Sequence, residues 1–196
     1  MIAYHSAMKK YGGVAKSENV KMNEVVSDGR ITLLQHDVCS DYIPEVFYLA
    51  DAIMVFPSWR AGYRHFTENT IAENTNFEQY CSGMARIVKT LGKPSFILTN
   101  RTFYQMIKAE RYVPIFIERF GSNDMCGVWN YDGDIPKTAF ELMKWVGKFG
   151  TVLDFSCGYG ELSHYVDKCI LSDINTGCIK YIRKELMKDG SSSQGD

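Results

Sequence analysis

The segment 152–161 carries the residue types and spacing best suited to holding a small ligand. An apolar run ends in Asp154, and Gly158 and Gly160 follow with one residue between them, leading into an expected helix. Glycines let the backbone approach a ligand where a Cβ would clash. A turn that follows a strand places such a ligand outside the carboxyl end of that strand. The segment therefore predicts a ligand-binding turn.

The residues after the glycines indicate what kind of ligand this turn suits. A dinucleotide-binding turn has the pattern Gly-x-Gly-x-x-Gly and directs a helix N-terminus at pyrophosphate. Here Ser163 stands at the third glycine position, and Glu161 brings a negative charge. This argues against a dinucleotide-dependent oxidoreductase. It favours a cofactor with a positive centre and no phosphate.

A second acid, Asp173, ends the next apolar run thirteen residues after Gly160. A carboxylate at the tip of a strand can accept hydrogen bonds from both hydroxyls of a ribose. The alternative interpretation is a plain tight turn at Gly158 and Gly160, with Asp173 capping a helix. The glycine pair together with Asp154 and Asp173 at this spacing favours a nucleoside cofactor.

Apolar runs alternate with segments of helical periodicity along most of the chain. We expect strands at 31–37, 52–56, 95–99, 113–119, 125–131, 151–154 and 168–173, and helices at 43–49, 77–91, 101–109, 137–149 and 176–188. The strands at 113–119 and 125–131 are joined by Phe-Gly-Ser-Asn-Asp, which is typical of a hairpin. Buried strands separated by helices predict an α/β fold: a mainly parallel, seven-stranded sheet with a late antiparallel hairpin, covered on both faces.

The 196-residue chain fits one domain. Lys, Gly and Ser are frequent in residues 1–28, which predicts a loosely structured N-terminal segment. Residues 29–189 then form the domain, and residues 190–196 are expected to be a disordered tail.

Composition excludes several classes of protein. The net charge of −1 gives no overall basic field for nucleic acid, so any such contact rests on a local patch. The six cysteines contain no Cys-x-x-Cys pair and no histidines stand at ligand spacing, so we expect no metal site and reduced thiols. No apolar stretch approaches the ~20 residues of a membrane span. These features predict a cytoplasmic protein that does not contact the membrane.

The motif Asp154-x-x-x-Gly158-x-Gly160, followed by Ser-Asp173-Ile-Asn175, resembles the first and second motifs of class I S-adenosylmethionine-dependent methyltransferases. In most of these enzymes the glycine motif opens the domain, whereas here most of the chain precedes it. This order resembles the circularly permuted DNA amino-methyltransferases of the β-type order. The resemblance implies a Rossmann-like class I methyltransferase fold, circularly permuted so that the last two strands lie at the centre of the sheet.

Three further segments carry the resemblance. Residues 33–37 resemble the strand and acid that contact the cofactor adenine, and residues 134–142 resemble the Lys-Pro-x-Glu-Leu segment at its methionine end. Residues 50–59 occupy the place of the Asp-Pro-Pro-Tyr or Asp-Pro-Pro-Trp catalytic loop. The resemblance implies S-adenosyl-L-methionine as the cofactor, held by Asp37, Lys137, Asp154, Gly158, Gly160 and Asp173, and an acceptor side formed by Phe56, Pro57, Ser58 and Trp59.

The catalytic loop departs from the family at its first residue. Family members have Asp, Asn or Ser there, whose side chain accepts a hydrogen bond from the target amino group, whereas Phe56 has no acceptor. Pro57 is retained, and Trp59 keeps the surface on which a flipped-out base stacks. Three interpretations stay open: Ser58 substitutes for the lost acceptor, the acceptor is not an exocyclic amine, or the site is degenerate.

The loop 60–76 follows directly and adds basic and aromatic side chains. Arg60, Tyr63 and Arg64 could hold a phosphate and a base, with a solvated loop as the alternative. We find no room for the target-recognition region usual in the family. The sequence thus predicts methyl transfer to a nucleobase amino group in nucleic acid or a nucleotide-like substrate. The alternatives are an enzyme that cleaves or hydrolyses the cofactor and a degenerate subunit with a homologous partner chain or a second copy.

Overall fold

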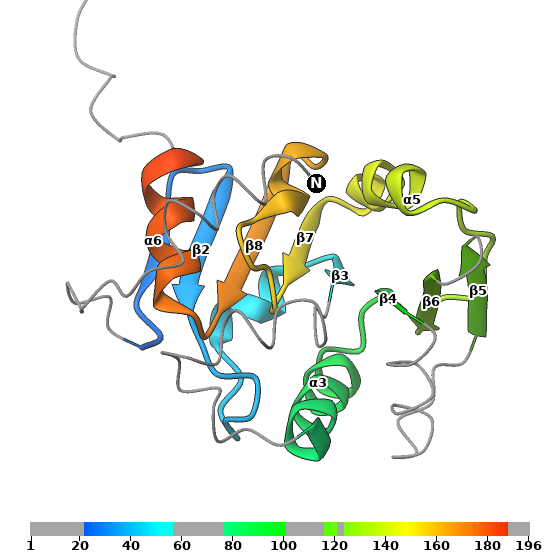
Figure 1. Ribbon diagram of the computed structural model, residues 1–196, viewed down its shortest axis with the longest axis horizontal. Helices are drawn as coiled ribbons and strands as arrows, with labels where there is room; N and C mark the ends of the chain where they lie inside the picture. The colour runs from blue at the N-terminus through cyan, green and yellow to red at the C-terminus, as the bar shows by residue number, and fades with distance from the viewer. Residues whose placement is uncertain (1–21, 57–76, 101–115, 121–123, 188–196) are drawn as a thin grey trace, which may run out of the picture.

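The computed structural model describes residues 22–56, 77–100, 116–120 and 124–187 (Figure 1). Within them, eight strands form one sheet in the order β1-β2-β8-β7-β3-β4-β6-β5. The strands are β1 Val25–Ser27, β2 Ile31–Gln35, β3 Ala52–Val55, β4 Ser95–Asn100, β5 Phe116–Phe120, β6 Asp124–Trp129, β7 Thr151–Asp154 and β8 Lys168–Asp173. The helices are η1 Glu45–Leu49, α3 Phe77–Leu91, α5 Ala139–Val146, η3 Gly147–Phe149, η4 Glu161–His164 and α6 Thr176–Glu185.

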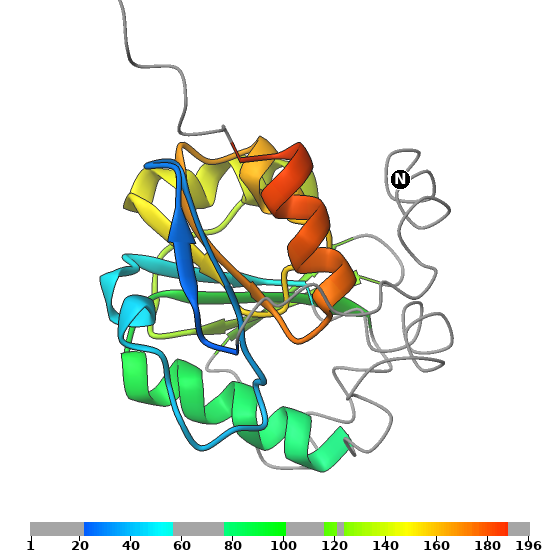
Figure 2. The same cartoon turned by 90° about the vertical axis from the view of Figure 1, so that its left-hand side faces the viewer.

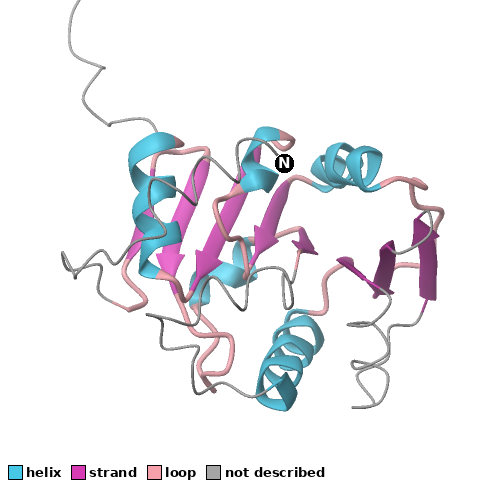
Figure 3. Cartoon of the chain, in the orientation of Figure 1, coloured by secondary structure: helices cyan, strands magenta, loops and turns pink. Residues whose placement is uncertain are grey.

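The sheet is mainly parallel, as predicted. Strands β2, β8, β7, β3 and β4 run parallel to one another, whereas the edge strand β1 pairs antiparallel with β2. The β5–β6 hairpin is antiparallel and joins the sheet at β4, at the end opposite β1 (Figure 3). The last two strands of the chain, β7 and β8, lie in the middle of the order. The expected α/β, Rossmann-like architecture with central C-terminal strands is therefore confirmed.

Helices cover both faces of the sheet. Successive strand residues point to opposite sides, so each buried strand contributes side chains to two cores. On β3, Ala52 and Met54 join the core under α5, η4 and α6, whereas Ile53 and Val55 join the core under η1 and α3. Figure 2 shows α3 on one side of the sheet and α5 and α6 on the other. All four of these β3 side chains are fully buried, which explains why the strand has no polar face.

Three elements differ from the expectation. A short edge strand, β1, lies within the segment 1–28 that was expected to be loose, and Val26 packs against the core. The helix expected after the glycine turn is only a four-residue 3-10 turn, η4, because the connection to β8 leaves no room for a longer helix. The segment 43–49 is also a 3-10 helix, which begins after Pro44. The expected helix at 101–109 and the tail 190–196 lie outside the described residues.

Candidate functional site

The two acids predicted to flank the site lie at the same edge of the sheet. Asp154 ends β7 and Asp173 ends β8, and these strands are parallel neighbours in which Asp154 pairs with Leu171. The arrowheads of β2, β8 and β7 point to one edge in Figure 1. The carboxyl ends of adjacent parallel strands are where α/β sheets bind ligands. The structure therefore places the two predicted acids at the ends of neighbouring strands.

The turn after β7 is tied down onto the end of β8. The backbone N–H of Gly158 donates to Asp173 Oδ2 at 2.9 Å, and the N–H of Cys157 donates to the Ser172 carbonyl at 3.0 Å. Asp173 Oδ1 accepts from the Asn175 N–H at 2.8 Å. Asp173 thus holds the glycine turn, and it is Asn175 that caps α6, accepting from the Gly177 N–H at 2.8 Å. The alternative interpretation, in which Asp173 caps a helix, is therefore wrong.

The two glycines of the turn serve different purposes. Both have positive φ, 51° at Gly158 and 77° at Gly160, a conformation that L side chains rarely adopt. A Cβ on Gly158 would meet no described atom within 4 Å. A Cβ on Gly160 would lie 3.0 Å from Leu186 and 3.1 Å from Ile182. Gly158 therefore leaves space above the turn, whereas Gly160 lets the turn pack against the C-terminal helix and the residues after it.

Burial shapes the electrostatics of the two acids. Asp154 is 1% exposed, and its Oδ1 accepts from the Ser156 N–H at 3.0 Å. Burial raises the pKa of Asp154 well above its usual value, and the nearby Asp173 carboxylate raises it further. Burial also raises the pKa of Asp173, although backbone N–H groups including those of Asn175 and Gly158 oppose the shift. Neither acid has an ion pair among the described residues, so a positively charged ligand at this edge would stabilise their ionised forms.

A contact that the sequence did not reveal joins the turn to α3. Tyr80 lies in the segment 77–91, for which the sequence predicts only a helix, yet its hydroxyl lies 2.7 Å from Ser156 Oγ. Ser156 lies between Asp154 and Gly158, so Tyr80 supports the turn from the face of the sheet that α3 covers. The two residues are 76 positions apart, and no local pattern indicates such a contact.

Replacing Tyr80 with phenylalanine is expected to lower the free energy of unfolding by about 1 kcal/mol, because one net hydrogen bond is lost while the ring is kept. Urea denaturation of the variant and the wild type measures the change. Tyr48→Phe is the matched control, since Tyr48 is half exposed on η1. An equal effect of the two substitutions would contradict the role assigned to the Tyr80 hydroxyl.

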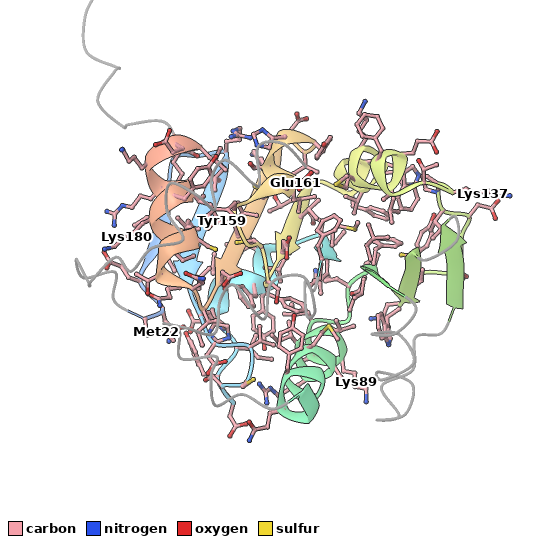
Figure 4. The ribbon with its side chains drawn as sticks, viewed as in Figure 1. Met22, Lys89, Lys137, Tyr159, Glu161 and Lys180 are labelled. Atoms are coloured by element: carbon pink, nitrogen blue, oxygen red, sulfur yellow. The ribbon has the colours of Figure 1, made fainter. Side chains whose placement is uncertain are left out.

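The structure describes three of the remaining predicted residues, Asp37, Phe56 and Lys137. Asp37 lies two residues beyond β2, the neighbour of β8, and is therefore at the same edge as Asp173. Phe56 directly follows β3, the neighbour of β7, and packs half-buried against the core. Lys137 is exposed, and Figure 4 shows it beyond the β5 end of the sheet, far from Tyr159 in the glycine turn. Lying outside the described residues are Pro57, Ser58, Trp59, Arg60, Tyr63 and Arg64.

The described residues also bear on metal binding and on the membrane. No group of three or more His, Cys, Asp or Glu side chains in this part of the chain is arranged to hold a metal ion. None of the described helices is both long and apolar enough to cross a membrane.

Comparison with known proteins adds one structural likeness. The chain is similar to the crystal structure of M1.HpyAVI, a DNA methyltransferase, with a TM-score of 0.50 and 15% sequence identity over 81% of this chain and 100% of that chain. No protein-family model and no curated protein match the sequence. At this identity the likeness shows a shared fold. It agrees with the Rossmann-like sheet described above.

Proposed function

We propose that this protein is an S-adenosylmethionine-dependent methyltransferase acting on a nucleobase amino group in nucleic acid or in a nucleotide-like substrate. The observation that carries the proposal is the glycine turn held over Asp173 at the carboxyl edge, with open space at Gly158. The shared fold with M1.HpyAVI supports the same class. The order of strands supports a circular permutation, because the strand before the glycine turn comes late in the chain and lies between β8 and β3.

The described residues fit this cofactor. The Asp173 carboxylate accepts the backbone N–H groups of Gly158 and Asn175, and it has lone pairs for further donors such as ribose hydroxyls. Gly158 lets a ligand approach the backbone, since a Cβ there would meet no described atom within 4 Å. Burial disfavours the charged form of Asp154, and a nearby ammonium or sulfonium group would favour that charged form. Asp37 would complete the adenine side, whereas the position of Lys137 gives it no part in the proposal.

Bound S-adenosylmethionine supplies an electrophilic methyl group on a sulfonium. The residues of this chain orient the reactants rather than transfer protons, because displacement at that methyl depends on alignment. Asp173 and the turn fix the nucleoside end, and Phe56 lies on the acceptor side at the end of β3. Phe56 has no hydrogen-bond acceptor in its side chain, so we assign the acceptor contacts to Ser58 and Trp59.

A second candidate is a protein that binds the cofactor without methylating a nucleobase. Phe56 favours it, because its side chain packs against the core instead of presenting an acceptor group. In this case the protein either consumes the cofactor by cleavage or hydrolysis or serves as a subunit for an active homologous chain.

Incubation with methyl-tritiated S-adenosylmethionine separates these functions. Label transferred to DNA, RNA or free nucleotides supports the proposed methyltransferase. Loss of the cofactor in the absence of any acceptor supports cleavage or hydrolysis instead. Cofactor binding without transfer or consumption would contradict both activities and leave the subunit role.

A further inference from the structure

We infer that helix α3 fixes the loop 37–41 through Arg86, and that Arg86 is a positioning residue for the adenosine end of the cofactor. The cofactor half of this inference rests on the proposed function. The clamp itself depends only on contacts within the chain. Arg86 lies 49 residues after Asp37, and strand β3 comes between them in the chain.

The Arg86 guanidinium bonds to the loop at three places. Nη2 donates to the Val38 carbonyl at 3.1 Å and also to the Ser40 carbonyl. Nη1 donates to Asp41 Oδ1 at 3.2 Å. A planar guanidinium offers several donors in fixed directions, so it can hold several acceptors of one loop at once. Two of the three acceptors are backbone carbonyls, and the side chain therefore restrains the course of the loop itself.

The helix approaches this loop without an intervening side chain. A Cβ on Gly83 would lie only 2.1 Å from the Val38 carbonyl oxygen. Val38 is buried in the same core cluster as Met84 and Ile87 of α3. The close approach at Gly83 brings the start of the loop within reach of Arg86, one turn further along the helix.

The clamped loop carries Asp37 at its first position. Asp37 Oδ1 accepts from the Cys39 N–H at 2.8 Å, and its carbonyl accepts from the Ser40 N–H at 2.9 Å. On the other side, the His36 N–H donates to the Asp173 carbonyl at 3.1 Å. Asp37 is thus held between Asp173, the proposed ribose ligand, and Arg86. Loss of the Arg86 side chain would free residues 38–41, whereas the bond between His36 and Asp173 would remain.

The test combines a structural and a binding measurement on the full chain. In Arg86→Met, amide hydrogen exchange of Cys39 and Ser40 should accelerate about tenfold, while the amides that pair β2 with β8 keep their rates. Affinity for S-adenosylhomocysteine should fall about tenfold. Arg86→Lys keeps the charge without the planar donors and should lose part of this affinity. Arg183→Met, on the exposed side of α6, is the matched control and should change neither measurement.

A double-mutant cycle with Asp37→Ala shows whether Arg86 acts through Asp37. If it does, Arg86→Met lowers affinity much less in the Asp37→Ala background than in the wild type. Additive losses would overturn the positioning role, and unchanged exchange at Cys39 and Ser40 would overturn the clamp. A wild type that fails to bind S-adenosylhomocysteine would overturn the proposed function and the adenosine assignment. The exchange rates would then still decide whether Arg86 clamps the loop.

Discussion

Replacing Gly83 with alanine is expected to lower the free energy of unfolding by about 3 kcal/mol. In most helices this substitution stabilises, because alanine is the better helix former by roughly 1 kcal/mol. Here the new Cβ would lie 2.1 Å from the Val38 carbonyl oxygen, so α3 or the loop 37–41 must shift. Overpacking of a core typically costs about 1–3 kcal/mol. We expect the upper end, because the obstacle is backbone and because the shift also disturbs the bonds of Arg86.

Gly147→Ala is the matched control for this prediction. Gly147 lies at the C-terminal end of α5 with a φ of −59°, and a Cβ there would meet Val166 at 3.4 Å, an ordinary contact. Its unfolding free energy should stay within about 0.5 kcal/mol of the wild type. Urea denaturation measures both variants. A stable Gly83→Ala variant would show that α3 does not pack directly on the Val38 backbone.

Acidification is expected to weaken the fold through His36. This side chain is 1% exposed, its Nδ1 lies 2.9 Å from Asn23 Oδ1, and its Nε2 is buried with no partner among the described atoms. Burial lowers the pKa of His36 from 6.5 to about 4; Asp37 opposes the shift and Arg86 adds to it. The unfolded chain therefore binds a proton that the folded chain rejects. The contribution of His36 to the free energy of unfolding is fully present above pH 6.5 and is lost as the pH falls towards 4, by about 3 kcal/mol in all.

The contribution of His36 is the difference between the wild type and His36→Gln, because other groups also titrate. Burial raises the pKa values of Asp154 and Asp173, so these two groups destabilise the fold as the pH rises. Urea denaturation at several pH values between 4 and 7 gives the stability of each protein. The wild type should lose more stability on acidification than the variant. Parallel pH profiles would contradict the assignment to His36.

Local sequence patterns were sufficient to predict the bounds of an element where its apolar run ended at a clear boundary. The strands β7 and β8 and the helix α3 have the predicted bounds, because an Asp ends each strand and Gly92 follows the helix. The short η4 was not foreseen, since the periodicity after Gly160 fits a helix as well as a 3-10 turn. A three-residue strand such as β1 is too short to show any periodicity of its own.

In the candidate site, too, the sequence predicted the parts that lie close together in the chain. Asp154 and Asp173 end consecutive strands and Gly158 lies in the turn that follows the first of them, so the spacing along the chain was enough to place them together. The supports of the site come from α3, where Gly83 and Arg86 contact a loop more than forty residues earlier in the chain. Such contacts depend on how α3 packs across the sheet, which sequence periodicity does not specify. Lys137 was assigned by resemblance alone, and the structure places it away from the glycine turn.

The measurement that tests the central claim most directly is calorimetric titration of the wild type and Asp173→Ala with S-adenosylmethionine. Asp173→Asn keeps one carbonyl for the two N–H groups that Asp173 now binds, and Asp167→Ala is an exposed control. We predict binding by the wild type and the control, and a ten- to hundredfold loss in the Asp173 variants, roughly 1.5–3 kcal/mol for charged hydrogen bonds. No binding by the wild type, or equal affinity in the Asp173 variants, would contradict a cofactor site at this edge of the sheet.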